Sequence, residues 1–144
     1  MRPRYLLDVN VPIAILRTDS PHHAAAASWM HASLERRAEI IVLAETLVAA
    51  VRLLSNARAW RHPTPPDRAV QGLDDLMTAT QARIVGAGLE SWHEFTRMAA
   101  SLDLTTRMVP DALVVSAALA HGATVATFDR GLGTYPGVRS VVLS

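Results

Sequence analysis

The sequence predicts an α/β domain built around a parallel sheet, and three observations lead to that fold class. Short apolar runs alternate along the chain with longer segments whose apolar residues recur at helical spacing. The apolar runs are continuous, which is typical of strands buried on both faces of a parallel sheet. The chain has 144 residues, of which 50% are hydrophobic and 19% charged, so we expect one globular domain spanning residues 1–144.

The first part of the chain is expected to contain two strands and two helices. Residues 4–8 (RYLLD) form a short buried strand that ends in an acid. Pro12 suits the first turn of a short helix that ends at Leu16. Apolar residues at helical spacing indicate an amphipathic helix over residues 22–36, and residues 39–43 (EIIVL) form the second strand.

The middle of the chain adds two helices and a third strand. Residues 44–56 form a helix directly after the second strand. Residues 61–66 (RHPTPP) form a loop, because proline removes a backbone donor and blocks a helix. Asp67 caps the next helix, and residues 82–85 (ARIV) form the third strand. The apolar faces of the two helices are expected to carry Leu47, Val48, Val51, Leu54, Val70, Leu73, Leu76 and Met77.

The last part of the chain completes the alternation of strands and helices. Ser91 and Glu94 form a capping box that opens another helix. Its inward face is expected to carry Trp92, Phe95, Met98 and Leu102. Residues 111–121 form an almost wholly apolar helix, and Gly122 ends it. The fourth and fifth strands are residues 124–128 (TVATF) and 138–143 (VRSVVL).

The composition excludes several classes of chemistry. The chain has no cysteine, so disulfides, thiolate metal sites and cysteine nucleophiles are excluded. All 14 basic residues are arginine, which excludes every mechanism that needs a lysine. With 13 acidic residues the net charge is only +1, and this balance indicates no particular partner. No apolar run approaches the roughly 20 residues that cross a bilayer, so we expect a cytoplasmic protein without membrane attachment.

Four acids lie at the ends of predicted strands or at the start of a predicted helix, where α/β proteins carry their functional residues. Asp8 ends the first strand, Glu45 follows the second, and Asp129 follows the fourth. Asp111 opens the apolar helix. Ligands bind such sheets at the carboxyl ends of the strands, so the first three acids are expected on one edge, and Asp111 joins them if its helix begins there.

Each acid alone also has a structural explanation. Aspartate is a favoured helix N-cap, and a glutamate in a first turn interacts with the helix dipole. Four carboxylates gathered in one crevice, however, repel one another and lose solvation unless a cation compensates them. Oxygen ligands favour a hard ion, Mg²⁺ or Mn²⁺. Such an ion activates water and neutralises phosphoryl oxygens, which is the chemistry of phosphodiester hydrolysis.

These residues resemble a known family. The segments LLDVNV, AET, VPDALVVSAALAHGATVATFDRGLG and YPGVRSVVL are similar to PIN-domain ribonucleases, and most of all to the VapC toxins of bacterial toxin–antitoxin pairs. The resemblance covers the whole chain. Its most specific part is the C-terminal block, where Asp111, His121-Gly122 and Thr127-Phe128-Asp129 follow the family's order and spacing.

The resemblance implies a fold and a set of roles. The fold would be a PIN-like three-layer α/β/α sandwich around a mostly parallel sheet of about five strands. The metal-binding and catalytic acids would be Asp8, Glu45, Asp111 and Asp129, holding Mg²⁺ or Mn²⁺. Asn10 and Thr127 would orient carboxylates or water. An RNA substrate, a small antitoxin and a homodimer of the chain would be the partners.

One departure from the family concerns the segment after the last aspartate. Gly131, Leu132 and Gly133 replace the more usual acidic and aromatic stretch, which predicts a more flexible loop beside Asp129. Arg130 is a candidate phosphate contact because it adjoins Asp129.

Three further side chains have two interpretations each. Trp60 adjoins arginines and a proline loop, so it could stack a base or form an oligomer contact. His22 and His23 could touch RNA, or they could be ordinary residues at an exposed helix N-terminus.

Rival functions are weaker on the same residues. A receiver-type phosphoacceptor needs a lysine, and a dehalogenase-like phosphatase needs a second aspartate where Asn10 stands. The remaining alternative is a PIN-like binding module without catalysis. Its signature would be the loss of an acid, and all four are present.

Overall fold

The computed structural model describes residues 2–144, so Met1, the first residue of the predicted domain, lies outside the described part. Five strands form one sheet in the order β3-β2-β1-β4-β5, and every neighbouring pair is parallel. The strands are β1 (Arg4–Leu7), β2 (Glu39–Leu43), β3 (Arg83–Val85), β4 (Thr124–Thr127) and β5 (Ser140–Val142). The predicted α/β class is confirmed, and the sheet is wholly rather than mostly parallel.

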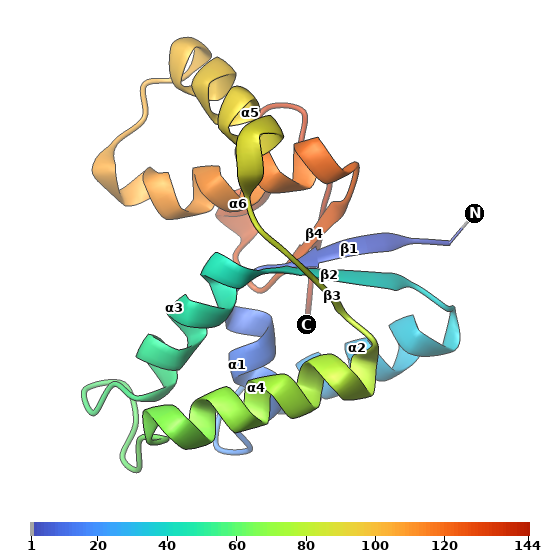
Figure 1. Cartoon of the computed structure of the whole chain (residues 1–144), viewed down its shortest axis with the longest axis vertical. Coiled ribbons are helices and arrows are strands. Elements are labelled where there is room, and N and C mark those ends of the chain that lie inside the picture. Colours follow the sequence, from blue (N-terminus) through green and yellow to red (C-terminus); the bar gives the residue numbers. More distant parts are fainter. Residues whose placement is uncertain (1) are drawn as a thin grey trace.

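Helices cover both faces of this sheet, as Figure 1 shows. One side carries α5 and α6, and the other carries α1 to α4. The α-helices within residues 2–144 are α1 (Asn10–Leu16), α2 (His23–Glu35), α3 (Ala44–Leu54), α4 (Pro66–Thr80), α5 (Gly88–Ser101) and α6 (Val109–His121). Two short 3₁₀ helices, η1 (Thr106–Met108) and η2 (Arg130–Thr134), flank α6 and β4.

The central strand β1 shows why both faces are apolar. Successive side chains on a strand point to opposite faces. Leu6 therefore joins the core beneath α5 and α6, and Leu7 joins the core beneath α1, α2 and α4. Both leucines are fully buried. The continuous apolar run thus has the cause expected from the sequence, a sheet covered on both sides.

Both predicted side-chain caps are wrong. The helix α5 begins at Gly88, so Ser91 lies inside its first turn and is only 1% exposed. The capping box of Ser91 and Glu94 is therefore absent. In α4 the N-cap is Pro65 and Asp67 lies in the first turn without capping it, because Pro66 already supplies a preorganised first residue.

Three side chains expected on inward helix faces are exposed. Trp92 is 59% exposed, Val48 71% and Val70 47%. In α5 the early start explains the error: Ser91 faces the core, and the next residue is turned by about 100° around the helix. Trp92 therefore points outward and stacks on Phe95 with 5.8 Å between the ring centroids.

The predicted end of α6 is confirmed. Gly122 adopts a left-handed conformation with φ of 61° and forms the C-cap. Within residues 2–144, no helix combines the length and apolarity that a membrane span requires.

Candidate active site

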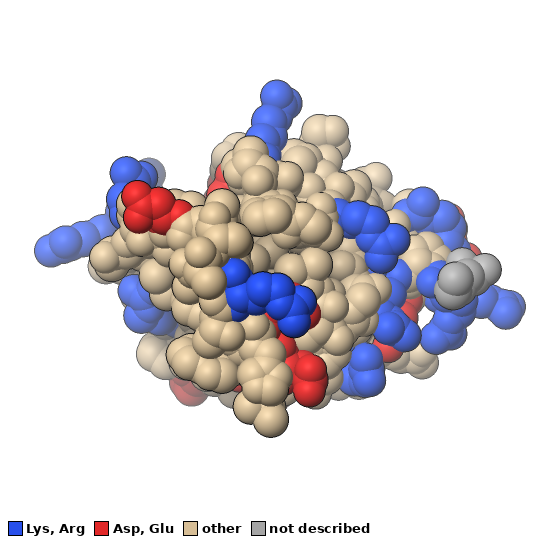
Figure 2. Space-filling model, turned by 90° about the horizontal axis from the view of Figure 1, so that it is seen from above, with Lys and Arg blue, Asp and Glu red and all other residues tan. Residues whose placement is uncertain are grey.

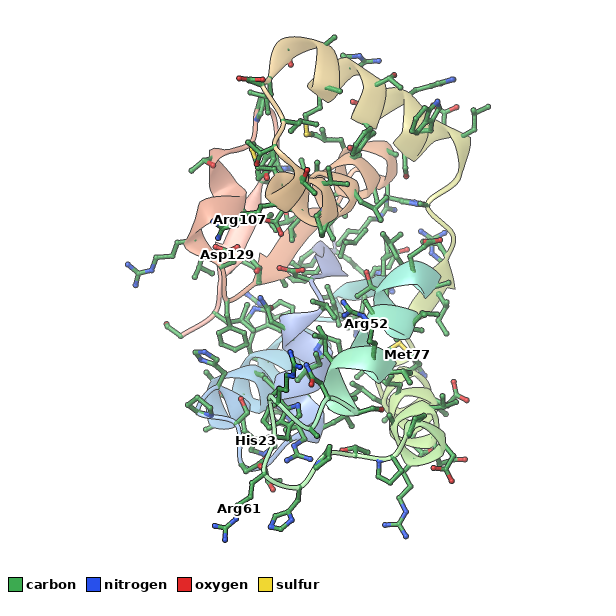
Figure 3. The ribbon with its side chains drawn as sticks, turned by 90° about the vertical axis from the view of Figure 1, so that its left-hand side faces the viewer. His23, Arg52, Arg61, Met77, Arg107 and Asp129 are labelled. Carbon is green, nitrogen blue, oxygen red and sulfur yellow. The ribbon has the colours of Figure 1, made fainter. Side chains whose placement is uncertain are left out.

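The carboxyl ends of the strands meet at one edge of the sheet, and Figure 3 faces this edge. Asp8 directly follows β1, and Asp129 follows β4 after one intervening residue. Glu45 lies in the first turn of α3, directly after β2, and Asp111 lies in the first turn of α6. In Figure 3 Asp129 sits at the open face between the two groups of helices. Each of the four predicted acids therefore lies next to the end of a strand or the start of a helix at this edge.

Asp8 is the most enclosed of the four acids, with 6% of its surface exposed. The Thr127 hydroxyl donates to Asp8 Oδ2 at 2.7 Å, and the Val9 backbone N–H donates to Oδ1 at 2.8 Å. The Asn10 amide lies 3.4 Å from Oδ2 as a weaker donor. These contacts hold the carboxylate in one orientation at the end of β1.

Thr127 and Asn10 tie the end of β1 to the end of β4. The Thr127 side chain is fully buried, and its oxygen accepts from the Asp129 backbone N–H at 2.9 Å and from the Asn10 amide at 3.3 Å. The Asn10 carbonyl oxygen accepts from the Phe128 backbone N–H at 3.2 Å. One hydroxyl thus orients Asp8 and the backbone that carries Asp129.

Asp129 caps η2 through its own side chain. Its Oδ1 accepts from the Gly131 backbone N–H at 2.8 Å, and the rest of the side chain is exposed. The predicted flexible loop is instead this 3₁₀ helix, anchored by the fully buried Leu132. A Cβ at Gly131 would lie 3.2 Å from Asp129 Oδ1, so glycine permits the close approach of backbone and carboxylate.

The charges of the acids interact across the site. Burial raises the pKa of Asp8; the hydrogen bonds from Thr127 and Val9 oppose this, and the charge of Asp129 adds to it. Burial also raises the pKa of Asp111, with further contributions from the charges of Asp8 and Asp129. Asp129 is therefore close enough to Asp8 and Asp111 for its charge to disfavour their ionised forms.

Tyr135 borders the same acids. Burial raises the pKa of Tyr135, and the charges of Asp111 and Asp129 add to the effect. Its hydroxyl donates to the Met108 carbonyl at 3.3 Å. Asp111 and Tyr135 both line a shallow depression with Gly131 and Thr134. Sequence reasoning assigned no role to Tyr135, although this residue opens the segment YPGVRSVVL that carries part of the family resemblance.

Glu45 is placed differently from the other three acids. It is exposed, and its two carboxylate oxygens accept from the Ala87 backbone N–H at 3.1 and 3.2 Å. Ala87 follows β3, so this carboxylate binds the chain on the β3 side of the site. The other three acids gather at the boundary between β1 and β4. The structure thus brings Asp8, Asp111 and Asp129 together more closely than it brings Glu45 to them.

A hard cation suits this donor set. Among residues 2–144, none of the four acids forms a salt bridge with an arginine or histidine. In the same part of the chain, no three acidic or histidine side chains are close enough to hold one ion jointly. Mg²⁺ usually binds proteins through one or two carboxylates and keeps several waters, which matches a loosely gathered set of oxygens. Asp8, Asp111 and Asp129 are the candidates to supply those one or two carboxylates, with waters completing the coordination.

Cations on the same face were missing from the sequence-based candidates. Figure 3 shows Arg107 near Asp129 in that view and Arg52 on α3. A usable signal existed for Arg52, which follows Glu45 by seven residues and so shares its face of α3. Arg107 lies in η1, before α6 begins, so its spacing from Asp111 gave no such signal. Arg130 is exposed beside Asp129, as its position in the sequence implies.

The aromatic candidates have structural partners. Trp60 donates its indole N–H to the Leu53 carbonyl at 3.1 Å, and the Arg17 guanidinium lies 4.3 Å from its ring. His23 is hydrogen-bonded to the Ala14 carbonyl at 2.9 Å. His22, by contrast, is exposed and stacks on Phe128 with ring centroids 4.4 Å apart. Phe128 adjoins Asp129, so this stack lies beside the candidate site.

The sequence of this chain is similar to those of known proteins. A sequence model of the family described as PIN domain matches residues 5–137. The chain is a PIN domain. The curated "VapC ribonuclease Mb2897" of Mycobacterium bovis is 31% identical over 134 residues, which cover 92% of this chain and 90% of that protein.

Solved structures share the fold of this PIN domain. VapBC2 from Rickettsia felis, solved with a DNA fragment from its promoter, matches with a TM-score of 0.76 and 14% identity. The match covers 98% of this chain and 99% of that one. VapC20 from Mycobacterium tuberculosis, described as a sarcin-ricin loop cleaving toxin, matches with a TM-score of 0.67 and 12% identity over 97% and 99% of the chains. The predicted PIN-like sandwich is therefore confirmed.

Proposed function

We propose that this PIN domain is a metal-dependent endoribonuclease and the toxin of a toxin–antitoxin pair. The observation that carries the proposal is the grouping of Asp8, Asp111 and Asp129 at one edge of the sheet, with no salt bridge to an arginine or histidine among residues 2–144. Burial raises the pKa of Asp8 and of Asp111, and the charge of Asp129 adds to both shifts. Curated relatives named VapC ribonucleases support the assignment of the activity to RNA.

Asp8, Asp111 and Asp129 would hold Mg²⁺ or Mn²⁺, directly or through water. When bound, the ion supplies charge neutralisation and lowers the pKa of water, as the hydrolysis of a phosphodiester requires. Thr127 and Asn10 keep Asp8 oriented toward the site through the hydrogen bonds described above. Those bonds also prevent the carboxylate from turning away when its charge is not neutralised.

The reaction is a hydrolysis at phosphorus. A water oxygen forms a bond to phosphorus, and the bond from phosphorus to the leaving ribose oxygen breaks. The proton lost by water passes to a carboxylate, for which Glu45 is our candidate because it is exposed and holds only backbone N–H contacts. The leaving oxygen takes a proton from solvent. Arg130, Arg107 and Arg52 are the candidate contacts for the charge on the phosphoryl oxygens.

The partners belong to the same proposal. Matched structures include the toxin–antitoxin complexes titled VapBC2 and VapBC, which supports a small antitoxin as the partner of this chain. We also propose that the chain forms a homodimer, as its family resemblance implies. Binding of an antitoxin over the carboxyl-end edge would block access of RNA to the acids.

The testing experiment is cleavage of single-stranded and structured RNA by the purified chain, with Mg²⁺ or Mn²⁺ against EDTA. Asp8→Asn should reduce the rate by at least about a thousandfold, because it removes a charged ligand from the site. Asp74→Asn is the matched control, since Asp74 is an exposed acid on α4. Equal rates for the chain and Asp8→Asn would refute the assignment.

The alternative is a PIN domain that binds without cutting. It is favoured by one observation, the loose spacing of the acids within residues 2–144. Calorimetry with Mn²⁺ separates the two functions when no cleavage is detected. If the unaltered chain binds Mn²⁺ with measurable heat and Asp8→Asn abolishes that heat, the nuclease is supported. If the unaltered chain gives no heat of Mn²⁺ binding, the binding module is supported.

A further inference from the structure

The amino ends of the strands surround a hollow of about 500 Å³ on the edge opposite the acids. We call it the amino-edge pocket, and its side chains include Arg2, Arg4, Tyr5, Glu39, Thr124 and Arg139. Figure 2 shows arginine side chains gathered at the right-hand end of the molecule, the end where Figure 1 places the amino terminus. Three arginines against one glutamate make this pocket basic.

The one acid of the pocket is already neutralised. Arg4 Nε lies 2.8 Å from Glu39 Oε2, and Arg83 Nη2 lies 3.1 Å from Oε1. The hydrogen bond from Arg4 is the largest cause of the lowered pKa of Glu39, and the nearby arginine charges add to it. Both carboxylate oxygens of Glu39 are therefore engaged by arginines.

Two arginines remain for an external anion. Among residues 2–144, neither Arg2 nor Arg139 has an ion pair with an acid. The C-terminus of α6, whose dipole disfavours anions, also borders the pocket. Arg4 covers it by donating from Nη1 to the His121 carbonyl at 2.8 Å. The electrostatic potential that Arg2 and Arg139 produce in the pocket is thus positive.

We propose that the amino-edge pocket binds backbone phosphates of the RNA away from the point of cleavage. This inference rests on the proposed ribonuclease function. The guanidinium fork matches phosphate oxygens in two parallel hydrogen bonds. The lining offers few apolar side chains, chiefly Pro3 and Tyr5, to anchor a folded protein or an acidic peptide.

A strand of RNA can reach both edges along β5. Arg139 immediately precedes β5, and Val142 at the other end of β5 pairs with Thr127 beside the acids. With about 3.3 Å per residue, the three residues of the strand separate the two edges by roughly 10 Å. Because β5 is an edge strand, no further strand lies outside it in the sheet. One RNA molecule could therefore contact the pocket and the acids together.

The test measures binding of a labelled single-stranded RNA of about 16 nucleotides to the full chain in EDTA, over a range of salt concentrations. The variant is Arg2→Ala with Arg139→Ala, and the matched control is Arg58→Ala with Arg68→Ala. The control arginines are exposed and lie away from the pocket, Arg58 in the loop after α3 and Arg68 in the first turn of α4. Unfolding midpoints of both double variants check that each is folded.

Each lost phosphate contact should lower the slope of log K against log salt by about 0.7 for single strands. We expect the Arg2/Arg139 variant to lose about 1.4 of slope and to bind roughly tenfold more weakly at low salt. Replacing both arginines by lysine should restore the slope, because the charges return. The Arg58/Arg68 control should keep the slope of the unaltered chain.

Three outcomes would overturn the proposal. One is an unchanged slope in the Arg2/Arg139 variant, and another is an equal loss in the control. The third is that polyglutamate binding, rather than RNA binding, depends on Arg2 and Arg139, which would assign the pocket to an acidic peptide. The nuclease proposal is judged separately, by cleavage with metal in the chain and in Asp8→Asn. A changed slope without cleavage would keep the pocket, and the Mn²⁺ calorimetry with Asp8→Asn would then decide the nuclease.

Discussion

Asp8 and Asp111 carry the same chemical group in opposite settings. The Asp8 carboxylate accepts hydrogen bonds from the Val9 backbone N–H, the Asn10 amide and the Thr127 hydroxyl. Within residues 2–144 Asp111 has no recorded hydrogen bond to its carboxylate, and burial and two neighbouring charges raise its pKa. Asp8 is therefore fixed before any cation binds, whereas Asp111 is free to turn toward one.

Thr127 should matter for stability and for activity. Thr127→Val removes the hydroxyl and leaves Asp8 Oδ2 and the Asp129 N–H without their strongest partner. The free energy of unfolding should fall by about 1–3 kcal/mol, and the cleavage rate should fall with it. Thr127→Ser keeps the hydroxyl and should lose less of both. Urea unfolding and RNA cleavage measure the two effects, and equal losses for valine and serine would contradict this role of the hydroxyl.

The raised pKa of Asp111 predicts a pH dependence of stability. In the unfolded chain Asp111 ionises near its ordinary pKa of 3.8, and in the folded chain it ionises at higher pH. The folded state therefore loses stability as pH rises from the unfolded value to the folded one, and the loss persists above it. Asp111→Asn should remove this loss.

Thermal unfolding in EDTA across acid and neutral pH checks the prediction. The variant should gain in melting temperature over the unaltered chain as pH rises, and the gain should level off at neutral pH. Added Mg²⁺ should narrow the gap, because a cation stabilises the ionised site. A gap that is constant with pH would show that Asp111 is not strained by its neighbours.

At the scale of elements, η2 connects the site to the sheet. Its Leu132 is fully buried, and a Cβ at Gly133 would lie 2.8 Å from Ser140 Oγ on β5. Gly133→Ala should therefore lower the free energy of unfolding by about 0.5–1.5 kcal/mol, because Ser140 Oγ must leave its rotamer to make room. In a Ser140→Ala background the same change should be milder, since the clashing oxygen is gone. Denaturant unfolding of the four proteins gives the coupling energy, and additive effects would contradict the contact.

The order and type of the elements could be predicted from the sequence, because continuous apolar runs and helical spacing report burial directly. The strand 39–43 and the stop at Gly122 are examples. Caps and inner faces could not be predicted as well, because they depend on where a helix begins. A start at Gly88 turned Ser91 inward and Trp92 outward, and no pattern within α5 reveals that shift.

The candidate site could be predicted as four positions but not as a geometry. Parallel strands place Asp8 and Asp129 at one edge, so their proximity follows from topology. The contact of Glu45 with Ala87 depends on the path of the chain after β3, which no residue pattern specifies. Tyr135 likewise reaches Asp111 only through tertiary packing.

At the scale of the whole molecule, the proposed homodimer needs an exposed apolar surface. The groove between α5 and α6 provides one, with Trp92 59% exposed and Val109 43% exposed. Light scattering should give the mass of a dimer for the full chain and of a monomer for Trp92→Arg. Val48→Arg is the control, because Val48 is an apolar side chain on α3 that is even more exposed, at 71%. A monomer in all three proteins would reject the dimer.

The pairing of β1 with β4 has a consequence for biosynthesis. The hydrogen bond from Thr127 to Asp8 joins residues 119 positions apart, and it lies at the centre of the sheet. A ribosome that has made the first hundred residues has therefore produced Asp8 without the strand that orients it. The site can form only after β4 and Asp129 have been made, since such distant contacts close late. Under the proposed function, nascent chains that lack β4 should not cleave RNA.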